Sequence, residues 1–253
     1  MSNPDIERAA RKLREGRVVV LTGAGLSVDS GIPDFRSAGG VWTRYSLEEY
    51  STIEAFRADP RKVWKLFAEM SDTLTEARPN PGHDALARLE SAGLVSGVIT
   101  QNIDGLHQAA GSKNVVEYHG SVAQLTCLTC SNKYPNAAPA SFEQVPDGPR
   151  VPLCACGAVL KPDIILFGEM IPYDAIRASR TWADQARVCL VCGTSAQVHP
   201  ASAIPDRCKD AGATVIEVNL ERIALTERTT DILLQGRTSD ILPALVAAAL
   251  SGS

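Results

Sequence analysis

Apolar and polar residues alternate along this chain in blocks that predict helices and strands in turn. Near the N-terminus, Asn3 and Pro4 are typical of a helix start, and Gly16 is typical of a helix end. Between them, apolar residues recur at the spacing of one helix face: Ile6, Ala9, Ala10 and Leu13. The apolar run 18–21, closed by Thr22, then predicts a buried strand.

The same alternation continues toward the C-terminus. Helices are predicted from about Asn80 to Gly93 and near residues 240–250. Further apolar runs of strand length lie at residues 94–100, 115–118, 164–167, 188–192, 214–218 and 232–234. Strands that alternate with helices favour a parallel sheet covered on both faces, so we expect an α/β fold.

Two segments interrupt this rhythm. Residues 37–78 contain helical stretches and many aromatic side chains, whereas residues 121–162 contain four cysteines and several prolines with little periodicity. We interpret both as insertions that together form a small lobe, with a helical part at 37–78 and a metal-binding part at 121–162. The sheet domain then comprises residues 1–36, 79–120 and 163–253. A cleft between two lobes is a common place for a ligand.

Composition narrows the class of protein. The 253 residues are 45% hydrophobic and 21% charged, which is typical of a soluble globular enzyme. A net charge of −4 argues against a protein that binds nucleic acid through its phosphates. No apolar run approaches the roughly 20 residues that span a bilayer, and the first residues do not resemble a signal peptide. We therefore expect a cytoplasmic protein with no membrane partner and no direct nucleic-acid binding.

The glycine-rich stretch after the first predicted strand is the most informative motif. It reads GAGLSVDSGIPDFR and occupies residues 23–36. Many α/β proteins bind a phosphate where a buried strand turns into glycines, because residues such as Gly23 and Gly25 let backbone amides approach the ligand. The polar residues at the end of the motif, Asp34 and Arg36, indicate that a cofactor is both held and acted upon there.

Four cysteines have the spacing of metal ligands. Cys127 and Cys130 form a CxxC pair, and Cys154 and Cys156 form a shorter CxC pair. Two such pairs supply the four thiolates of a tetrahedral Zn²⁺ site, and four protein ligands leave no open position for water. The proline-rich surroundings lack the apolar content to fold alone, which favours zinc over unrelated core thiols. We therefore expect one structural zinc ion.

The other three cysteines have no such arrangement. Cys189 and Cys192 also form a CxxC pair, but they lie inside an apolar strand and should point to opposite faces of the sheet. We interpret both, together with Cys208, as buried core thiols.

Polar residues follow three of the predicted strands. The carboxyl ends of parallel strands face the binding crevice of an α/β sheet. Since asparagine and aspartate also favour turns, any one of these strand ends is equally well explained by turn chemistry. Together with the glycine turn they predict one nucleotide crevice. Its candidate residues are Gln101, Asn102, Asp104, Gly193, Thr194, Ser195, Asn219 and Glu221.

His119 is a candidate general base. It ends the apolar run 115–118, where the cysteine-containing insertion begins, and this places it at the mouth of the predicted cleft. Imidazole titrates near neutrality and suits proton transfer. A hydrogen-bonded structural histidine is the alternative, and we favour that interpretation for His83 and His107. His199 follows a strand-end loop and is a candidate to line the cleft.

Taken together, these motifs resemble the sirtuins of bacterial and archaeal type, which are NAD-dependent protein-lysine deacylases. The matching motifs occur in order along nearly the whole chain: GAGLSVDSGIPDFR (23–36), TQNID (100–104), HG (119–120), the four cysteines, FGE (167–169), GTS (193–195) and VNLE (218–221). The resemblance implies a Rossmann-like parallel-sheet domain with an inserted small lobe.

The resemblance also implies roles for individual residues. His119 is the implied general base, and Asn102 and Asp104 are implied to act with it at the nicotinamide. An acyl-lysine protein or peptide is implied to bind between the lobes, near Phe167, Gly168, Glu169 and Val198. The implied NAD-binding residues are Gly23, Ala24, Gly25, Ser27, Ile32, Asp34, Phe35, Arg36, Gln101, Asn102, Ile103, Asp104, Gly193, Thr194, Ser195, Asn219, Leu220 and Glu221.

The implied reaction consumes NAD as a co-substrate and gives nicotinamide, O-acyl-ADP-ribose and free lysine. His119 takes a proton from a ribose hydroxyl, while the enclosed site keeps water away from the reacting sugar.

One departure from the family concerns the acyl group. Sirtuins of the desuccinylase type carry a Tyr-x-x-Arg pair that holds an acidic acyl group, and this chain has Phe67 and Met70 there. Without a guanidinium to pair with a carboxylate, acetyl and other neutral acyl groups are expected. A second difference is His199, where relatives often carry an aromatic residue.

Three other functions fit part of the pattern. An NAD-dependent dehydrogenase would use the same crevice but release NADH, and a mono-ADP-ribosyltransferase would share the first bond cleavage. A zinc-ribbon module for nucleic acid would need a basic surface near the cysteines, where only Lys133, Arg150 and Lys161 lie close in sequence.

Overall fold

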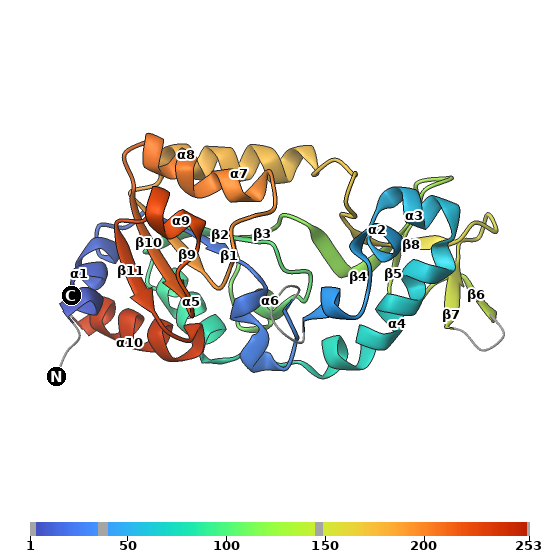
Figure 1. The fold of residues 1–253 in the computed structure, drawn as a ribbon, viewed down its shortest axis with the longest axis horizontal. Helices are drawn as coiled ribbons and strands as arrows, with labels where there is room; N and C mark the ends of the chain where they lie inside the picture. The colour runs from blue at the N-terminus through green and yellow to red at the C-terminus, as the bar shows by residue number, and fades with distance from the viewer. Residues whose placement is uncertain (1–3, 35–39, 145–148, 252–253) are drawn as a thin grey trace.

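The computed structural model describes residues 4–34, 40–144 and 149–251. Figure 1 shows a larger part, in which a sheet lies between helices, beside a smaller part that contains α2 to α4 and β4 to β8. This arrangement matches the α/β fold with an inserted small lobe that the sequence predicts.

The larger part is built on a six-stranded sheet in the order β11-β10-β9-β1-β2-β3, and every neighbouring pair is parallel. This order is that of a Rossmann-type sheet, in which ligands bind at the carboxyl ends of the strands near the point where the order reverses. Here the order reverses between β1 and β9. The strands are β1 (Val18–Thr22), β2 (Val95–Thr100), β3 (Val115–Glu117), β9 (Val188–Cys192), β10 (Thr214–Asn219) and β11 (Ile232–Gln235).

Helices cover both faces of this sheet (Figure 1). Strand β1 shows why, because alternate side chains enter different cores: Val18 and Val20 join one cluster, and Val19 and Leu21 join the other. The first cluster packs under α1 (Pro4–Leu13), α5 (Pro81–Ser91) and α10 (Thr238–Ser251). The second packs under α7 (Tyr173–Gln185), α8 (Ile204–Asp210) and α9 (Ala224–Arg228). A short helix, α6 (Leu106–Ala109), follows β2.

The smaller part combines helices with short antiparallel strands. Its helices are α2 (Leu47–Tyr50), α3 (Ile53–Ala58) and α4 (Pro60–Glu76). Its strands form a sheet β5-β4-β8 and a hairpin β6-β7. They are β4 (Gly120–Cys127), β5 (Lys133–Pro135), β6 (Ser141–Gln144), β7 (Arg150–Leu153) and β8 (Leu160–Ile164).

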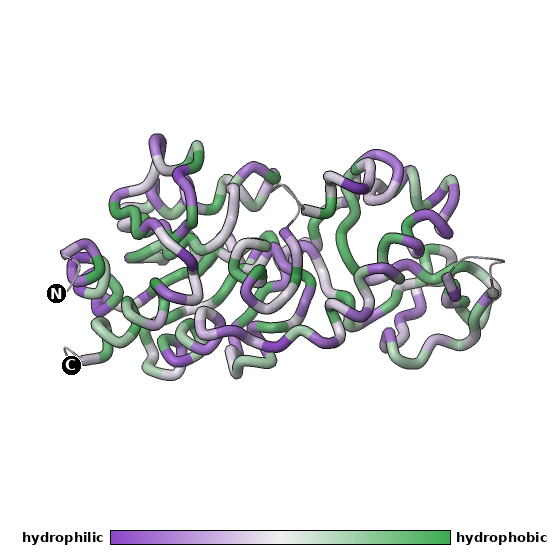
Figure 2. The backbone as a smooth tube through the Cα atoms, turned by 60° about the horizontal axis from the view of Figure 1, so that its bottom comes forward, coloured by the Kyte–Doolittle hydropathy of each residue, from purple (hydrophilic) through white to green (hydrophobic). Residues whose placement is uncertain are grey.

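The two halves of the smaller part share one hydrophobic core. Val63 and Trp64 of α4 pack with Leu125, Val151 and Leu160 of the strands. The Trp64 indole N–H also donates to the Leu160 carbonyl at 2.8 Å. Insertions that are separate in sequence therefore fold as one packed unit. Figure 2 shows hydrophobic stretches running through the interior of both parts of the molecule.

The prediction that residues 164–167 form a strand of the parallel sheet is wrong. Ile164 ends β8 and pairs antiparallel with Gly120, and Phe167 makes only an isolated bridge with Thr52. The backbone of this segment pairs with His119, Gly120 and Ser51 and not with a strand of the parallel sheet, which apolar content alone does not reveal. Other predicted elements begin and end within about three residues of those observed.

No helix in the described ranges is long and apolar enough to cross a membrane.

Candidate active site

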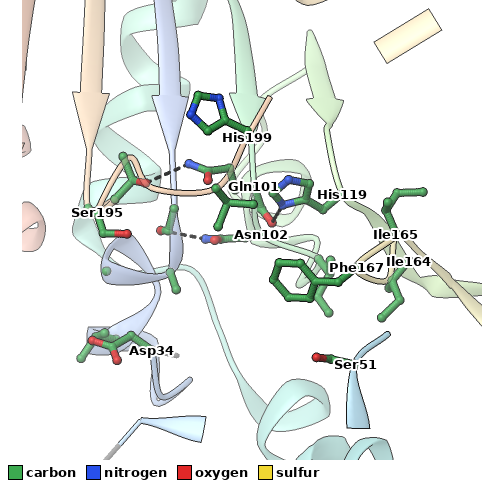
Figure 3. Close-up of a pocket in the computed structure, with 18 of the residues that line it drawn as sticks. Asp34, Ser51, Gln101, Asn102, His119, Ile164, Ile165, Phe167, Ser195 and His199 are labelled. Carbon is green, nitrogen blue, oxygen red and sulfur yellow. Dashed lines mark hydrogen bonds between the residues drawn. The ribbon is translucent and has the colours of Figure 1, made fainter. Parts of the chain in front are cut away.

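A cavity of about 610 Å³ opens at the carboxyl ends of the parallel strands and reaches into the smaller part. In Figure 3, His119 lies close to Gln101 and Asn102, with Ile164 and Ile165 on its other side and Phe167 below it. Most of the residues predicted from the sequence line this cavity: Gly23, Ala24, Gly25, Asp34, Gln101, Asn102, Ile103, His119, Phe167, Gly168, Glu169, Gly193, Thr194, Ser195, Val198, Asn219, Leu220 and Glu221.

The glycine turn after β1 interlocks with the turn after β9. The Gly25 amide donates to the Gly193 carbonyl at 2.8 Å. A Cβ on Gly25 would lie 2.8 Å from that same oxygen, and a Cβ on Gly23 would lie 2.7 Å from the Thr194 Cβ. Gly25 is therefore required by the close approach of the Gly193 backbone and Gly23 by the Thr194 side chain, in addition to any contact with a phosphate.

Asn102 is held by a buried hydrogen-bond network at the end of β2. Its amide nitrogen Nδ2 donates to the Gly23 carbonyl at 3.1 Å and to Ser27 Oγ at 3.0 Å. Ser27 Oγ in turn donates to Asp104 Oδ2 at 2.7 Å. The Asn102 backbone N–H donates to Thr100 Oγ1 at 3.0 Å. The network fixes which side of the Asn102 amide carries the oxygen, so a ligand meets one defined orientation.

His119 is held in the tautomer that a general base needs. Its Nδ1 lies 3.1 Å from the Gln101 carbonyl oxygen. A carbonyl can only accept, so Nδ1 carries the proton and Nε2 is left as the basic nitrogen. Burial lowers the pKa of His119 from its ordinary value, and the bond to Gln101 opposes this only in part. The neutral, proton-accepting form is therefore favoured near neutral pH.

The turns after β9 and β10 are also joined by side chains. Asn219 Oδ1 accepts from the Thr194 backbone N–H at 3.1 Å, and Asn219 Nδ2 donates to the Thr194 carbonyl at 3.2 Å. Nδ2 donates as well to Glu217 Oε1 at 2.9 Å, and this buried carboxylate accepts from the Thr226 hydroxyl. Gln101 Nε2 donates to Thr194 Oγ1 at 2.9 Å, which links the ends of β2 and β9. The crevice is thus assembled by cross-links between strand ends.

The four predicted zinc ligands come together in the smaller part. The sulfur atoms of Cys127, Cys130, Cys154 and Cys156 all lie within 4.8 Å of one another. Two of the distances are 3.6 Å and 3.4 Å, close to the roughly 3.8 Å expected between sulfurs bonded to one Zn²⁺ at about 2.3 Å. The donor set therefore fits a tetrahedral zinc ion.

Tyr134 supports this cluster from outside the ligand set. Its hydroxyl accepts from the Ala155 N–H at 3.2 Å and lies 3.3 Å from Cys154 Sγ, to which it donates when the sulfur is a thiolate. Hydrogen bonds from the Cys156 backbone and the Tyr134 hydroxyl lower the pKa of Cys154 to about 6. By contrast, Cys189 and Cys192 pack into cores on opposite faces of the sheet, as predicted.

A model of the Sir2 family matches residues 23–200 of the chain. This chain belongs to the Sir2 family. It is 48% identical over 229 residues to NAD-dependent protein deacylase 2 of Pyrobaculum aerophilum, covering 90% of this chain and 89% of that protein. It is 40% identical over 242 residues to the NAD-dependent protein deacylase of Thermococcus kodakarensis, covering 94% and 93%.

Solved Sir2 structures share the fold of this Sir2-family chain. A Sir2 homologue in complex with NAD superposes with a TM-score of 0.87 at 38% identity, covering 97% of this chain and 94% of that one. A Sir2 variant with a deacetylated p53 peptide and 3′-O-acetyl ADP ribose also superposes with a TM-score of 0.87. It is 34% identical, and the match covers 96% of this chain and 97% of that one. A Sir2 protein bound to a myristoylated histone peptide superposes with a TM-score of 0.79 at 34% identity, and the match covers 98% of this chain and 97% of that one.

Some predicted residues of this Sir2-family chain lie away from the cavity wall. In the described part of the chain, Ser27 and Asp104 lie behind Asn102, and Ile32 packs with Ala77 and Leu106 in a small separate core. Phe35 and Arg36 lie outside the described residues.

The cavity also contains residues that the sequence reasoning missed. Gly236, Arg237 and Thr238 follow β11 and line the cavity, as do Tyr50 and Ser51 from the smaller part. The strand-end pattern that identified residues 193–195 and 219–221 applies equally after residues 232–235, so the first group was open to prediction. Tyr50 and Ser51 lie in a helical insertion, and no local pattern in the sequence marks them as site residues.

Proposed function

We propose that this chain is an NAD-dependent protein-lysine deacylase that gives nicotinamide, O-acyl-ADP-ribose and free lysine. One observation carries the proposal: His119, with a basic Nε2, lines the same cavity as the interlocked glycine turns. Relatives with the name NAD-dependent protein deacylase, at 48% and 40% identity over most of the chain, support the same activity.

NAD is proposed to occupy the crevice at the strand ends as a co-substrate. The glycine turn at residues 23–25 and the turn at 193–195 would hold its phosphates, and Asn219 to Glu221 its adenosine side. Gln101, Asn102 and Ile103 would hold the nicotinamide and its ribose, with Asp104 and Ser27 fixing Asn102 from behind. Asp34, Phe35 and Arg36 are proposed to cover the reacting ribose.

The acyl-lysine peptide is proposed to enter between the two parts of the molecule, along Phe167, Gly168 and Val198, with Glu169 nearby. The acyl carbonyl oxygen of the substrate would displace nicotinamide from the ribose carbon. His119 Nε2 would then accept a proton from a ribose hydroxyl of the co-substrate, and that oxygen would attack the acyl carbon. Addition of one water molecule would release free lysine and leave the acyl group on ADP-ribose. Apolar residues of the cavity wall, such as Ile164, Ile165 and Leu166, would keep water from the reacting ribose until nicotinamide has left.

The acyl group is proposed to be neutral. Leu66, Phe67 and Met70 of α4 line the cavity, and none of them can pair with a carboxylate. A zinc ion held by Cys127, Cys130, Cys154 and Cys156 would be structural, because four protein sulfurs complete its tetrahedron.

Two broader proposals accompany the function. The NAD-binding domain is proposed to comprise residues 1–36, 79–120 and 163–253, and the small lobe 37–78 and 121–162. Three separate sheets support this division, with β4 and β8 of the small lobe extending past its bounds to Gly120 and Ile164. A cytoplasmic location fits a site of four thiolates, because such ligands persist under reducing conditions.

Mass spectrometry of an acetyl-lysine peptide, with and without NAD, tests the proposal for wild type and His119→Ala. Deacetylation that requires NAD and yields O-acetyl-ADP-ribose is expected for wild type, with at least a hundredfold lower rate for the variant. An ADP-ribosylated peptide would indicate a mono-ADP-ribosyltransferase, and a rise in NADH absorbance would indicate a dehydrogenase. Deacetylation without NAD would overturn the mechanism.

A further inference from the structure

Lys161, which is buried, and Glu169, which is half-buried, form an ion pair beside the segment proposed to bind the peptide. Lys161 Nζ lies 2.9 Å from Glu169 Oε2, and the Lys161 side chain is only 4% exposed. The carbonyls of Pro162 and Ile164 accept the other ammonium hydrogen bonds. All three donors of the ammonium group are therefore satisfied inside the protein.

Such a buried cation needs an explanation. Among the described residues, Lys161 is the only lysine or arginine that is buried. Burying an ammonium ion is costly, and a buried ion pair seldom stabilises a fold more than apolar side chains of similar size. Its role is therefore better sought in the geometry that it fixes than in stability.

Glu169 closes a tight turn at residues 166–169. Its backbone N–H donates to the Leu166 carbonyl at 3.0 Å, and its Oε2 accepts from the Leu166 N–H at 2.8 Å. Both backbone polar groups of Leu166 are thus bonded within the turn. Phe167 and Gly168 stand at its tip and line the cavity, and Phe167 is 38% exposed. The Glu169 carboxylate is turned toward Lys161 and Leu166, although the residue lies at the cavity wall.

The same segment joins three regions of the molecule. The Ile165 N–H donates to the His119 carbonyl at 2.8 Å. The Phe167 N–H donates to the Ser51 carbonyl at 2.9 Å, and the Phe167 carbonyl accepts from the Ile53 N–H at 3.0 Å. Figure 3 shows Ile165 and Phe167 beside His119, with Ser51 nearby. A displaced turn would therefore change the wall of the peptide site next to the general base.

We propose that Lys161 and Glu169 are positioning residues that hold the turn at 166–169 in the shape that receives the peptide backbone of the acylated substrate. Glu169 acts through Lys161 and Leu166, without contacting the acyl-lysine itself. The inference rests on the proposed deacylase function. It predicts that the ion pair affects binding of the peptide and leaves binding of NAD unchanged.

Steady-state kinetics and calorimetry on the zinc-loaded full chain test this role, with Lys161→Met, Glu169→Ala and Glu169→Gln. We expect the KM for an acetyl-lysine peptide to rise at least tenfold in the first two variants, with kcat within about threefold of wild type and the Kd for NAD within about twofold. Glu169→Gln keeps an oxygen for the Leu166 N–H and should recover most of the loss. For free Nα-blocked acetyl-lysine, which lacks the peptide backbone, KM should change less than threefold.

Lys133→Met is the matched control, because Lys133 forms an exposed ion pair with Asp163 at 2.7 Å and does not line the cavity. Its kinetics should equal those of wild type. Hydrogen exchange should be faster at residues 164–170 in Lys161→Met, while β1 and β9 keep their protection, and this readout remains available if activity is low. An unchanged peptide KM, or a peptide KM and NAD Kd that change together, would overturn the inference. A wild-type protein without NAD-dependent deacetylation would instead contradict the proposed function.

Discussion

At the scale of single residues, the chemistry of this site depends on how His119 is surrounded. Its Nδ1 donates to the Gln101 carbonyl, so the basic Nε2 is set by a backbone group at the end of β2. Burial lowers the pKa of the imidazole from its ordinary value. A histidine with a lowered pKa stays neutral, and so able to accept a proton, to a lower pH than an exposed one.

The pH dependence of catalysis should report this shift. We expect kcat/KM for an acetyl-lysine peptide to fall as the pH drops, with a midpoint below the value of about 6.5 that is usual for histidine. The activity is retained above that midpoint because the imidazole is then unprotonated. His199→Gln, which changes an exposed histidine at the cavity, should leave the midpoint in place. A midpoint above 7 would contradict the role assigned to burial.

Two residues of α4 should decide the acyl preference. Wild type is expected to remove a succinyl group at least tenfold more slowly than an acetyl group, because Phe67 and Met70 offer no cation. In the double variant Phe67→Tyr and Met70→Arg, the succinyl kcat/KM should rise at least tenfold, since a hydrogen bond to a charged group contributes about 1.5–3 kcal/mol.

Chromatographic separation of the peptide products measures both rates. Met70→Leu is the control, because it keeps the size and apolar character of the side chain and should leave the acetyl preference unchanged. A wild type that removes succinyl as fast as acetyl would show that the acidic group is bound elsewhere.

At the scale of elements, the site is formed where two strands of the same sheet end. The turns after β1 and β9 are adjacent because β1 and β9 are paired in parallel register, from Val18 with Val188 to Thr22 with Cys192. Gly25 and Gly193 are needed because the backbones of the two turns nearly touch. The motif at residues 23–25 is easily found in sequence, but the reason for Gly193 appears only when its partner strand is known.

Gly193→Ala tests this interlock. Gly193 has φ +59°, and a Cβ there would lie 2.3 Å from the Leu26 backbone nitrogen, so the turns must separate. We expect the affinity for NAD, measured by calorimetry, to fall at least tenfold. Gly212→Ala is the matched control, because Gly212 has φ +92° but no atom within 4 Å of the added Cβ. It should cost about 1–2 kcal/mol in stability and leave NAD affinity unchanged.

At the scale of the whole molecule, the cysteine cluster and α4 depend on each other. Cys127 and Cys154 belong to the same core as Ile53, Phe56 and Trp64, so the helical insertion packs on the zinc-binding one. The six-stranded sheet has its own cores on its two faces. Loss of the metal should therefore loosen the smaller part and spare the sheet.

Removal of zinc by a chelator tests this coupling. We expect hydrogen exchange to become fast at residues 121–162 and in α4, while β1, β2 and β9 remain protected. Deacetylation should be lost, because α4 and the segment 164–169 line the peptide side of the cavity. Added Zn²⁺ should restore both the protection from hydrogen exchange and the deacetylation activity. Fast exchange confined to residues 121–162, with α4 still protected, would contradict the shared core.

The sequence by itself determined the α/β class, most of the strand ends that line the cavity, the four sulfur ligands and the candidate base. These features are local: a buried strand, the turn that follows it and the residues of that turn are contiguous, so residue type and spacing carry the information. The run at residues 164–167 shows the limit of this reasoning, since its apolar content predicted a sheet strand and its true partners are His119 and Ser51.

Only the tertiary structure decided which distant residues meet. The tautomer of His119 depends on the Gln101 carbonyl. The need for glycine at position 193 depends on the nearby Leu26 backbone, and the turn at 166–169 depends on the buried Lys161 of β8. Strand pairing and core packing bring these groups together from far apart in the chain, and hydrogen bonding then fixes their orientation. A linear pattern can name such residues, but their contacts follow from long-range packing.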